Sequence, residues 1–385
     1  MTGGQPSRFG QWGLERGLWQ LGGFSEFETF FAGPRALDRM AEVRRAISHI
    51  RSNWDLYPQF MGELRTFLEV VSRSSPLAPE LEAYSEDGRR RVEVLLSSRK
   101  EWPEFRSGAV EDDYSAIRLY TSIYGYTIMF GAMNTAFRAA NINRYPQALR
   151  AAAFLVELLN IDLYNYIRAN PEADDFEGRV YRGMRVSGND LDKFADTATN
   201  KDMEKRYTAV PLSMTSASLS RSKALPFATR TEKSPIDSHG LLLDVSVYSL
   251  DPALLAAYRQ AFPGSIVTSL CSVPIHPLSD LPEDEILLRG PFFQIVRMYR
   301  DEDSLRGEPL HVVQAIMLNS NRDHITAVAT DTGKDKHMRD IFRAMATASR
   351  SARCAEDAES YGLSADSDNY RRAAAQAHAY ISNGM

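Results

Sequence analysis

The stretch Leu281–Ile295, with the sequence LPEDEILLRGPFFQI, is the one around which the chain is organised. Its two apolar runs, separated by Gly-Pro, predict two strands, and Glu283 and Glu285 stand two residues apart where the first begins. Because side chains at this spacing project to the same side of a strand, both carboxylates face one way. Two like charges so close repel each other, and in a cleft both lose hydration. The pair therefore predicts either a hydrated rim or a reaction site.

The composition limits the class of protein and of partner. The chain has 385 residues, enough for two domains or for one large domain with extensions, and a formal net charge of -5. No run of Lys and Arg interleaves with aromatic residues, so no nucleic-acid partner is expected. The two cysteines, Cys271 and Cys354, stand in no pattern typical of a metal site. We expect neither a disulfide scaffold nor a bound metal.

The N-terminal residues show no targeting signal that can be read from the sequence. Met1–Phe31 lacks a basic start followed by a long apolar run, so no secretory signal is predicted. No stretch reaches the roughly 18 apolar residues of a spanning helix. No membrane span is expected.

The pattern divides the chain into four parts. Residues 1–34 are rich in Gly and aromatic residues and predict a flexible tail. Residues 35–110 carry apolar residues at helical spacing, as at Phe60 and Leu64, and predict a helical segment that is a structural or partner-docking module. Two Ala-rich runs in residues 331–385 predict a C-terminal helical extension.

The part between these segments changes from helical to strand patterns. Helical spacing covers Tyr114–Ala140 and Pro146–Ala169, and short apolar runs bounded by turn residues follow. The predicted strands are Arg179–Met184, Ala209–Ser218, Gly240–Val247, Ile266–Val273, Glu285–Leu288, Phe293–Tyr299 and His311–Leu318. Because these strands do not alternate with helices, the pattern predicts an α+β fold and not a doubly wound sheet.

Polar residues interrupt two of the other predicted strands. Arg182 stands inside the first, which is costly unless it meets an anion, and Gly183 beside it lets another group approach the backbone. The alternative is an edge-strand arginine that faces water. Ser216 and Ser218 share one face of the second strand, where hydroxyls orient a charged neighbour. The alternative there is a strand that runs into a Ser-rich loop.

In this order, the three polar groups resemble the arginine-serine-glutamate class of mono-ADP-ribosyltransferases. Arg182 resembles the first-strand arginine, Ser216-Ala217-Ser218 the Ser-Thr-Ser strand, and Glu283-Asp284-Glu285 the Glu-x-Glu strand. Ala217 departs from the pattern, although some members of the family also carry Ala there. The resemblance implies a split, mostly antiparallel β-sandwich core that encloses an NAD cleft.

The resemblance extends to further residues. It implies that residues 111–330 form the catalytic domain and that Phe227 packs against nicotinamide, with Arg230 near the phosphates. Tyr126 and Asn134 resemble residues on the helix that borders the NAD cleft, although any packed helix shows the same spacing.

The family implies a role for each site residue. Glu285 stabilises the positive charge that develops on ribose when NAD loses nicotinamide, and Ser216 holds Glu285 in place. Arg182 contacts NAD phosphate or ribose, and Gly183 offers backbone groups to the nicotinamide amide. Glu283 takes a proton from an acceptor guanidinium, since members that modify other side chains commonly have Gln there. These implications predict NAD as substrate and a protein acceptor with an exposed arginine.

Two other functions compete with this expectation. The same cleft serves a NAD glycohydrolase if water is the acceptor, and a protein that keeps the fold without turnover is a binding module. Members of the family with a signal sequence and disulfides act at cell surfaces. No such signal sequence or disulfide pattern is read in this sequence. The chain is therefore expected to be cytoplasmic, or a secreted toxin or effector that acts in a host cytosol.

Overall fold

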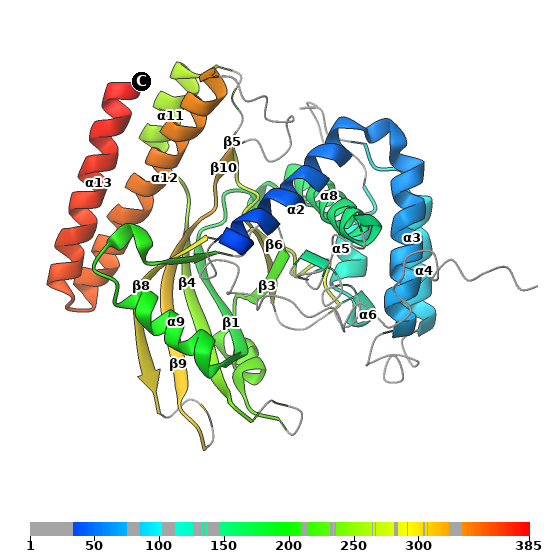
Figure 1. The fold of residues 1–385 in the computed structure, drawn as a ribbon, viewed down its shortest axis with the longest axis horizontal. Helices are drawn as coiled ribbons and strands as arrows, with labels where there is room; N and C mark the ends of the chain where they lie inside the picture. Colours follow the sequence, from blue (N-terminus) through cyan, green and yellow to red (C-terminus); the bar gives the residue numbers. More distant parts are fainter. Residues whose placement is uncertain are drawn as a thin grey trace, which may run out of the picture. The chain divides into compact units, whose positions relative to one another are not determined.

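The computed structural model describes most of the chain beyond its N-terminal residues (Figure 1). The described residues are 34–74, 85–101, 112–125, 129, 133, 136–137, 146–209, 214–231, 234, 236–263, 265, 267–280, 284–290, 292–302, 305, 307–322 and 333–385. Tyr126, Asn134 and Glu283 lie outside them, as does the expected tail except for Pro34. No helix among the described residues is long and apolar enough to cross a membrane.

The chain forms two compact units. The first comprises residues 1–171, 212–214 and 276–282, and the second comprises residues 172–211, 215–275 and 283–385. The helices of the first unit are α2 (Pro34–Ser52), α3 (Tyr57–Ser74), α4 (Ser85–Ser97), α5 (Ser115–Tyr120), α6 (Ile123–Gly125) and α8 (Pro146–Ala169). The helical character predicted for residues 35–110 is confirmed over α2, α3 and α4.

Helix α8 is the centre of the first unit. It is buried around its whole circumference, as expected for a helix with neighbours on several sides, and α2, α3 and α5 pack on it. Two ion pairs fasten the neighbouring helices to it. Arg51 of α2 meets the buried Glu157 at 2.7 Å, and Arg150 donates from Nε to Glu63 of α3 at 2.6 Å.

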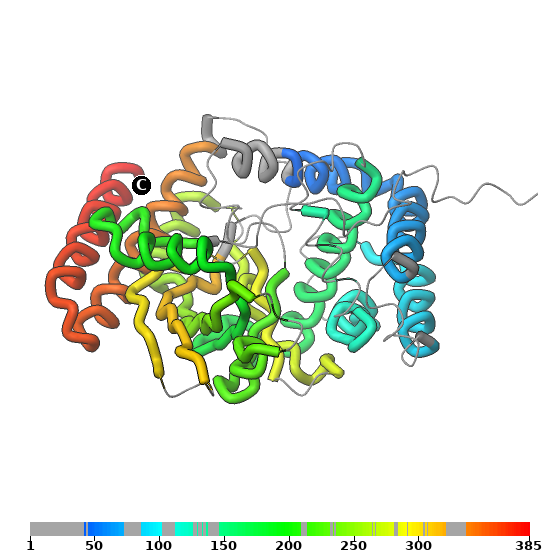
Figure 2. Tube along the Cα trace, turned by 60° about the horizontal axis from the view of Figure 1, so that its bottom comes forward, coloured from blue at the N-terminus to red at the C-terminus, as the bar shows by residue number. Residues whose placement is uncertain are grey.

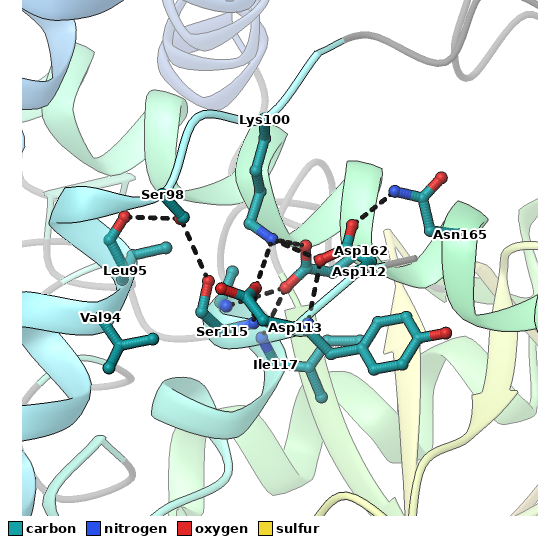
Figure 3. A network of polar contacts seen from close by, with 12 residues as sticks. Val94, Leu95, Ser98, Lys100, Asp112, Asp113, Ser115, Ile117, Asp162 and Asn165 are labelled. Atoms are coloured by element: carbon teal, nitrogen blue, oxygen red, sulfur yellow. Dashed lines mark hydrogen bonds and ion pairs between the residues drawn. The ribbon is translucent and has the colours of Figure 1, made fainter. Parts of the chain in front are cut away.

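A buried ion network joins α8 to the start of α5 (Figure 3). Lys100 Nζ lies 2.8 Å from Asp112 Oδ1 and 3.1 Å from Asp113 Oδ1, and it also pairs with Asp162 of α8. Asp162 accepts the backbone N–H groups of Ala116 and Ile117, which have no partner within the first turn of α5. Burial raises the pKa of Asp162 to about 7, although Lys100 opposes the rise.

The second unit is built on a mixed sheet that is mostly antiparallel. Its strands run in the order β2-β8-β9-β4-β1-β3-β7-β6; β4 pairs with β9 in parallel, and the other neighbouring strands of this sheet whose register is described are antiparallel. The bounds are β1 (Gly178–Ser187), β2 (Tyr207–Ala209), β3 (Met214–Ser218), β4 (Ser238–Tyr248), β6 (Ser272–Pro274), β7 (Glu285–Arg289), β8 (Phe292–Asp301) and β9 (Leu310–Leu318). A helical part followed by this sheet confirms the α+β class.

The described pairing between β1 and β3 is short. In the described part of the chain, the register of these two strands contains the single pair Tyr181 and Ser218, whereas β1 and β4 are paired along their length. Five strands therefore lie on one side of a weak junction and three on the other. This division agrees with the split arrangement expected from the sequence.

Two predicted strands are each divided in the structure. In the run Ala209–Ser218, Ala209 pairs with Phe292 at one edge of the sheet, whereas β3 lies beside β1 and β7. In the run Ile266–Val273, β5 (Val267–Thr268) pairs with β10 (Asn321–Arg322), and Ser272 pairs with Leu288. Each of these two runs therefore pairs with strands at two different positions, and the pattern of apolar residues does not show where the run divides.

Short helices and two long ones cover the second unit. They are α9 (Gly188–Ala198), η7 (Met203–Lys205), α10 (Arg221–Ala224), η8 (Leu225–Ala228), α11 (Pro252–Ala261), α12 (Gly333–Ser360) and α13 (Ser364–Gly384). Helices α12 and α13 lie side by side (Figure 2) and share apolar clusters with the sheet, to which they contribute Cys354 and the fully buried Tyr370. The predicted C-terminal helices are confirmed, and they belong to the same compact unit as the sheet.

Candidate active site

Three of the predicted site residues stand on adjacent strands of the second unit. Arg182 lies on β1, Ser216 on β3 and Glu285 on β7, and these strands follow one another in the sheet. Arg182 Nη1 donates to the backbone oxygen of Ser216 at 2.6 Å. Residues separated by up to about a hundred positions in the sequence are thereby brought to one region of the sheet.

Glu285 is the first residue of β7 and is almost wholly buried. The residue is 3% exposed, and its backbone oxygen accepts the N–H of Ile275 at 3.0 Å. Pairing of β7 with β6 continues from this point, with Ile286 opposite Pro274. Because burying a carboxylate is costly, neighbouring polar groups must compensate for the lost hydration of this side chain.

The two serines of β3 have different surroundings. Ser216 Oγ is buried and has no hydrogen-bond partner in the part of the chain that the structure describes. Ser218 Oγ accepts the N–H of Ser220 at 3.0 Å and so begins the turn that leads into α10. Buried hydroxyls are normally hydrogen-bonded, so Ser216 offers a polar group to a ligand or to a neighbouring side chain, whereas Ser218 has a local structural partner.

Gly183 is required by packing. A Cβ atom at this residue would lie 2.0 Å from the backbone oxygen of Ala224 and 3.1 Å from the backbone nitrogen of Ala228. The absence of a side chain at Gly183 therefore lets the backbone of the α10–η8 segment pack closely against β1. This contact explains the glycine without reference to a ligand.

Phe227 and Arg230 lie on the surface of this segment. Phe227 of η8 is 44% exposed, so part of its ring is accessible from solvent, as is common for single apolar side chains at a surface. Arg230 is exposed and donates from Nη2 to the backbone oxygen of Ile236 at 3.0 Å. Both belong to the segment that follows the serine strand.

The turn before Glu285 has a feature that sequence reasoning missed. Asp284 has a φ of 50°, in the left-handed region, which Asp and Asn tolerate better than most residues do. Its backbone oxygen accepts the N–H of Leu219 at 3.1 Å, and its carboxylate lies 3.0 Å from Lys223 Nζ. The position of Asp284 between two Glu residues was the only sign in the sequence of this turn, and nothing in the sequence identified Lys223 as the partner of Asp284.

A second polar row on the same sheet was also missed from the sequence. Arg179 Nε lies 3.0 Å from Asp244 Oδ1, Gln314 Nε2 donates to Asp244 Oδ2 at 3.1 Å, and Arg297 Nε donates to Gln314 Oε1 at 2.6 Å. The four side chains cross the adjacent strands β1, β4, β9 and β8. These contacts link the four strands side by side.

Among the described residues, no group of three or more His, Cys, Asp and Glu side chains is arranged to hold a metal ion. Of the predicted site residues, Arg182 contributes a guanidinium on β1, Ser216 a buried hydroxyl on β3, and Phe227 a partly exposed ring on η8.

No model of a protein family and no curated protein matches the chain. Among solved structures, it is similar to Vis toxin, an ADP-ribosyltransferase from Vibrio splendidus, with 16% identity over 66% of this chain and 88% of that one, and a TM-score of 0.37. Plx2a, an ADP-ribosyltransferase toxin from Paenibacillus larvae, is 18% identical over 60% of this chain and 96% of its own, with a TM-score of 0.32. An ADP-ribosyltransferase from Clostridium botulinum is 16% identical over 62% of this chain and 95% of its own, with a TM-score of 0.31.

Proposed function

We propose that the chain is an NAD-dependent mono-ADP-ribosyltransferase that transfers ADP-ribose to arginine side chains of a protein acceptor and releases nicotinamide. One observation carries this proposal. Arg182, Ser216 and the buried Glu285 occupy three consecutive strands, β1, β3 and β7, of one sheet. The proposal rests on these residues of the chain and on the family pattern that their sequence resembles.

The reaction breaks the bond between the nicotinamide nitrogen and C1′ of ribose. Positive charge develops on the sugar as nicotinamide leaves, and a fixed carboxylate stabilises that charge more in the transition state than in the ground state. Glu285 supplies this carboxylate, and its burial strengthens the interaction because the local dielectric is low. C1′ then bonds to a guanidine nitrogen of the acceptor, which loses one proton.

Ser216 and Arg182 support this step in different ways. The Ser216 hydroxyl has no partner among the described residues, so it makes no hydrogen bond to Glu285 as the sequence had led us to expect, and we assign it instead to a hydroxyl of the bound ribose. Arg182 uses one N–H on the backbone of Ser216, so the plane of its guanidinium is fixed relative to β3. We assign this guanidinium to the phosphate or ribose of NAD, because guanidinium groups bind phosphate through charge-assisted hydrogen bonds.

Arginine as the acceptor is proposed from the residue type at position 283. An acceptor guanidinium is protonated at neutral pH and becomes a nucleophile only when a base takes a proton. Glu283, two residues before Glu285 in the sequence, is the proposed base. We place the activity in a cytosol, that of the cell or of a host, where thiols such as the buried free Cys271 and Cys354 remain reduced.

The proposal is tested with labelled NAD and agmatine as a minimal acceptor. We expect the wild type to label agmatine, Glu285→Gln to lose both agmatine labelling and nicotinamide release, and Glu283→Gln to lose labelling but keep some nicotinamide release. Glu356→Gln, at an exposed glutamate of α12, is the matched control and should equal the wild type. Free ADP-ribose without labelled agmatine would favour a NAD glycohydrolase, and equal mild effects at positions 283 and 285 would contradict the assigned roles.

A further inference from the structure

The turn that carries Asp284 is attached at two points to the end of the serine strand. The Asp284 backbone oxygen accepts the N–H of Leu219, and its carboxylate meets Lys223 Nζ at 3.0 Å. Leu219 directly follows β3, and Lys223 lies in α10, one turn further along the chain. Asp284, the residue immediately before Glu285, is therefore held by the segment that follows β3, the strand that carries Ser216 and Ser218.

Glu285 is held from its other side by the residue that follows β6. Its backbone oxygen accepts the N–H of Ile275 at 3.0 Å, and Glu285 is 3% exposed. The ion pair is by contrast open to water, since the side chains of Lys223 and Asp284 are 39% and 48% exposed. Glu285 thus stands between a buried backbone contact on one side and a solvent-exposed ion pair on the other.

The left-handed conformation of Asp284 makes its anchoring important. L residues rarely adopt a φ of 50°, so the turn tends to relax toward another conformation unless neighbouring contacts hold it. Any rotation at Asp284 changes the direction in which the chain enters Glu285. The Leu219 bond and the Lys223 ion pair are the described contacts that oppose this rotation.

We infer that Lys223 and Asp284 are positioning residues that fix the turn before Glu285 and thereby set how ADP-ribose divides between an arginine acceptor and water. This inference rests on the proposed function. In both outcomes the bond from C1′ to nicotinamide breaks. C1′ then bonds to a guanidine nitrogen or to a water oxygen, and the acceptor gives up one proton. A guanidine must be aligned with C1′ and with its base, whereas water is small and reorients freely, so loss of alignment lowers transfer more than hydrolysis.

The test compares variants that remove the pair with variants that keep it. Lys223→Gln removes the cation at similar length, and Asp284→Asn removes the charge but keeps a residue that tolerates positive φ. Lys223→Arg keeps the pair. Lys205→Gln is the matched control, because Lys205 meets Asp202 at the same 3.0 Å in an exposed pair away from β3, β6 and β7.

The first readout is the ratio of agmatine labelling to NAD hydrolysis. We expect about a two- to fivefold fall in Lys223→Gln and in Asp284→Asn, no further fall in the double variant, and wild-type ratios in Lys223→Arg and Lys205→Gln. High salt should move the wild type toward Lys223→Gln, because exposed ion pairs are screened. The melting temperature should not change, since such pairs contribute little to stability. An unchanged ratio, additive effects of the two single variants, or a parallel fall of both activities with the melting temperature would overturn the inference.

The second readout is hydrogen exchange, which does not depend on NAD chemistry. The Leu219 amide should exchange faster in Lys223→Gln and Asp284→Asn, whereas the Ile275 amide, which bonds Glu285, should keep its wild-type rate. If the wild type turns over no NAD, the proposed function has failed. The exchange rate of the Leu219 amide then tests by itself whether Lys223 and Asp284 fix the turn before Glu285. Faster exchange in both variants then supports the positioning role, and unchanged exchange refutes it.

Discussion

Gly183 is the residue at which packing and the proposed chemistry meet. A Cβ atom there would overlap the backbone oxygen of Ala224, and the preceding residue, Arg182, contacts Ser216. The position therefore supports the α10–η8 segment that carries Phe227 as well as the strand that carries Arg182. A change at Gly183 should disturb both.

Gly183→Ala is expected to lower the free energy of unfolding by about 1–3 kcal/mol, because an added methyl group must displace backbone atoms. The measurement is denaturant unfolding of the purified variant. Gly188→Ala is the control, since a Cβ there meets nothing closer than His239 Nε2 at 3.7 Å. Equal stability of the two variants would contradict the packing assigned to Gly183.

Phe227 offers a second test at a single side chain. Removal of its exposed ring should leave stability nearly unchanged but cost about 0.5–1.5 kcal/mol of ring stacking with NAD, equivalent to roughly a 2–10-fold higher KM. Steady-state nicotinamide release by Phe227→Ala measures this. Ile236→Ala, at a side chain that is 84% exposed two residues before β4, should keep the wild-type KM. A KM for Phe227→Ala equal to that of the wild type would remove Phe227 from the NAD site.

Between helices α5 and α8, the stability of the first unit depends on a buried cation. Lys100 and Asp162 are both buried, and Asp162 also holds the first N–H groups of α5. Lys100→Met leaves the carboxylates without their cation, and breaking a buried pair from one side costs about 3–5 kcal/mol. Arg65→Gln, which breaks an exposed ion pair with Glu93 in the same unit, should cost less than about 1 kcal/mol.

The loss in Lys100→Met should depend on pH in a defined direction. The pKa of Asp162 rises from an ordinary 3.8 to about 7 on folding, so the folded chain binds the extra proton between these values. Stability contributed by this group therefore falls as pH rises through that window. Removal of Lys100 raises the pKa further, so the deficit of Lys100→Met should be smaller at low pH and largest above about pH 7. Urea unfolding across this range measures it, and a deficit that grows as pH falls would contradict the account.

In the second unit as a whole, the C-terminal helices complete the core of the sheet. Tyr370 of α13 is fully buried and donates to the backbone oxygen of Ile295 at 2.7 Å, and Cys354 of α12 packs with Val296 and Ile316. A chain that ends at residue 332 exposes this apolar face. We expect it to lose cooperative thermal unfolding of the sheet and to bind a hydrophobic dye. A truncated chain that unfolds as cooperatively as the wild type would show that α12 and α13 are dispensable.

The sequence predicted the parts of this molecule that depend on local pattern. Apolar alternation located the strands that carry Arg182, Ser216 and Glu285, and the residue types at those places suggested the chemistry. It could not place β3 between β1 and β7, because strand order depends on pairing between distant segments. Lys100 and Lys223 were missed for the same reason, since their acidic partners lie in other segments or turns. The run Ile266–Val273 was predicted as one strand but contains β5 and the first residues of β6, because the apolar pattern does not tell which sheet a strand joins.

Glu285 is central to the proposed activity, in which it acts on NAD beside Arg182 and Ser216. The direct measurement is calorimetric NAD binding combined with nicotinamide release for the wild type and Glu285→Gln. We predict that both proteins bind NAD with dissociation constants within a few-fold of each other, and that the variant releases nicotinamide at least about 100-fold more slowly. A wild type that binds no NAD, or a Glu285→Gln variant that releases nicotinamide at the wild-type rate, would contradict the claim.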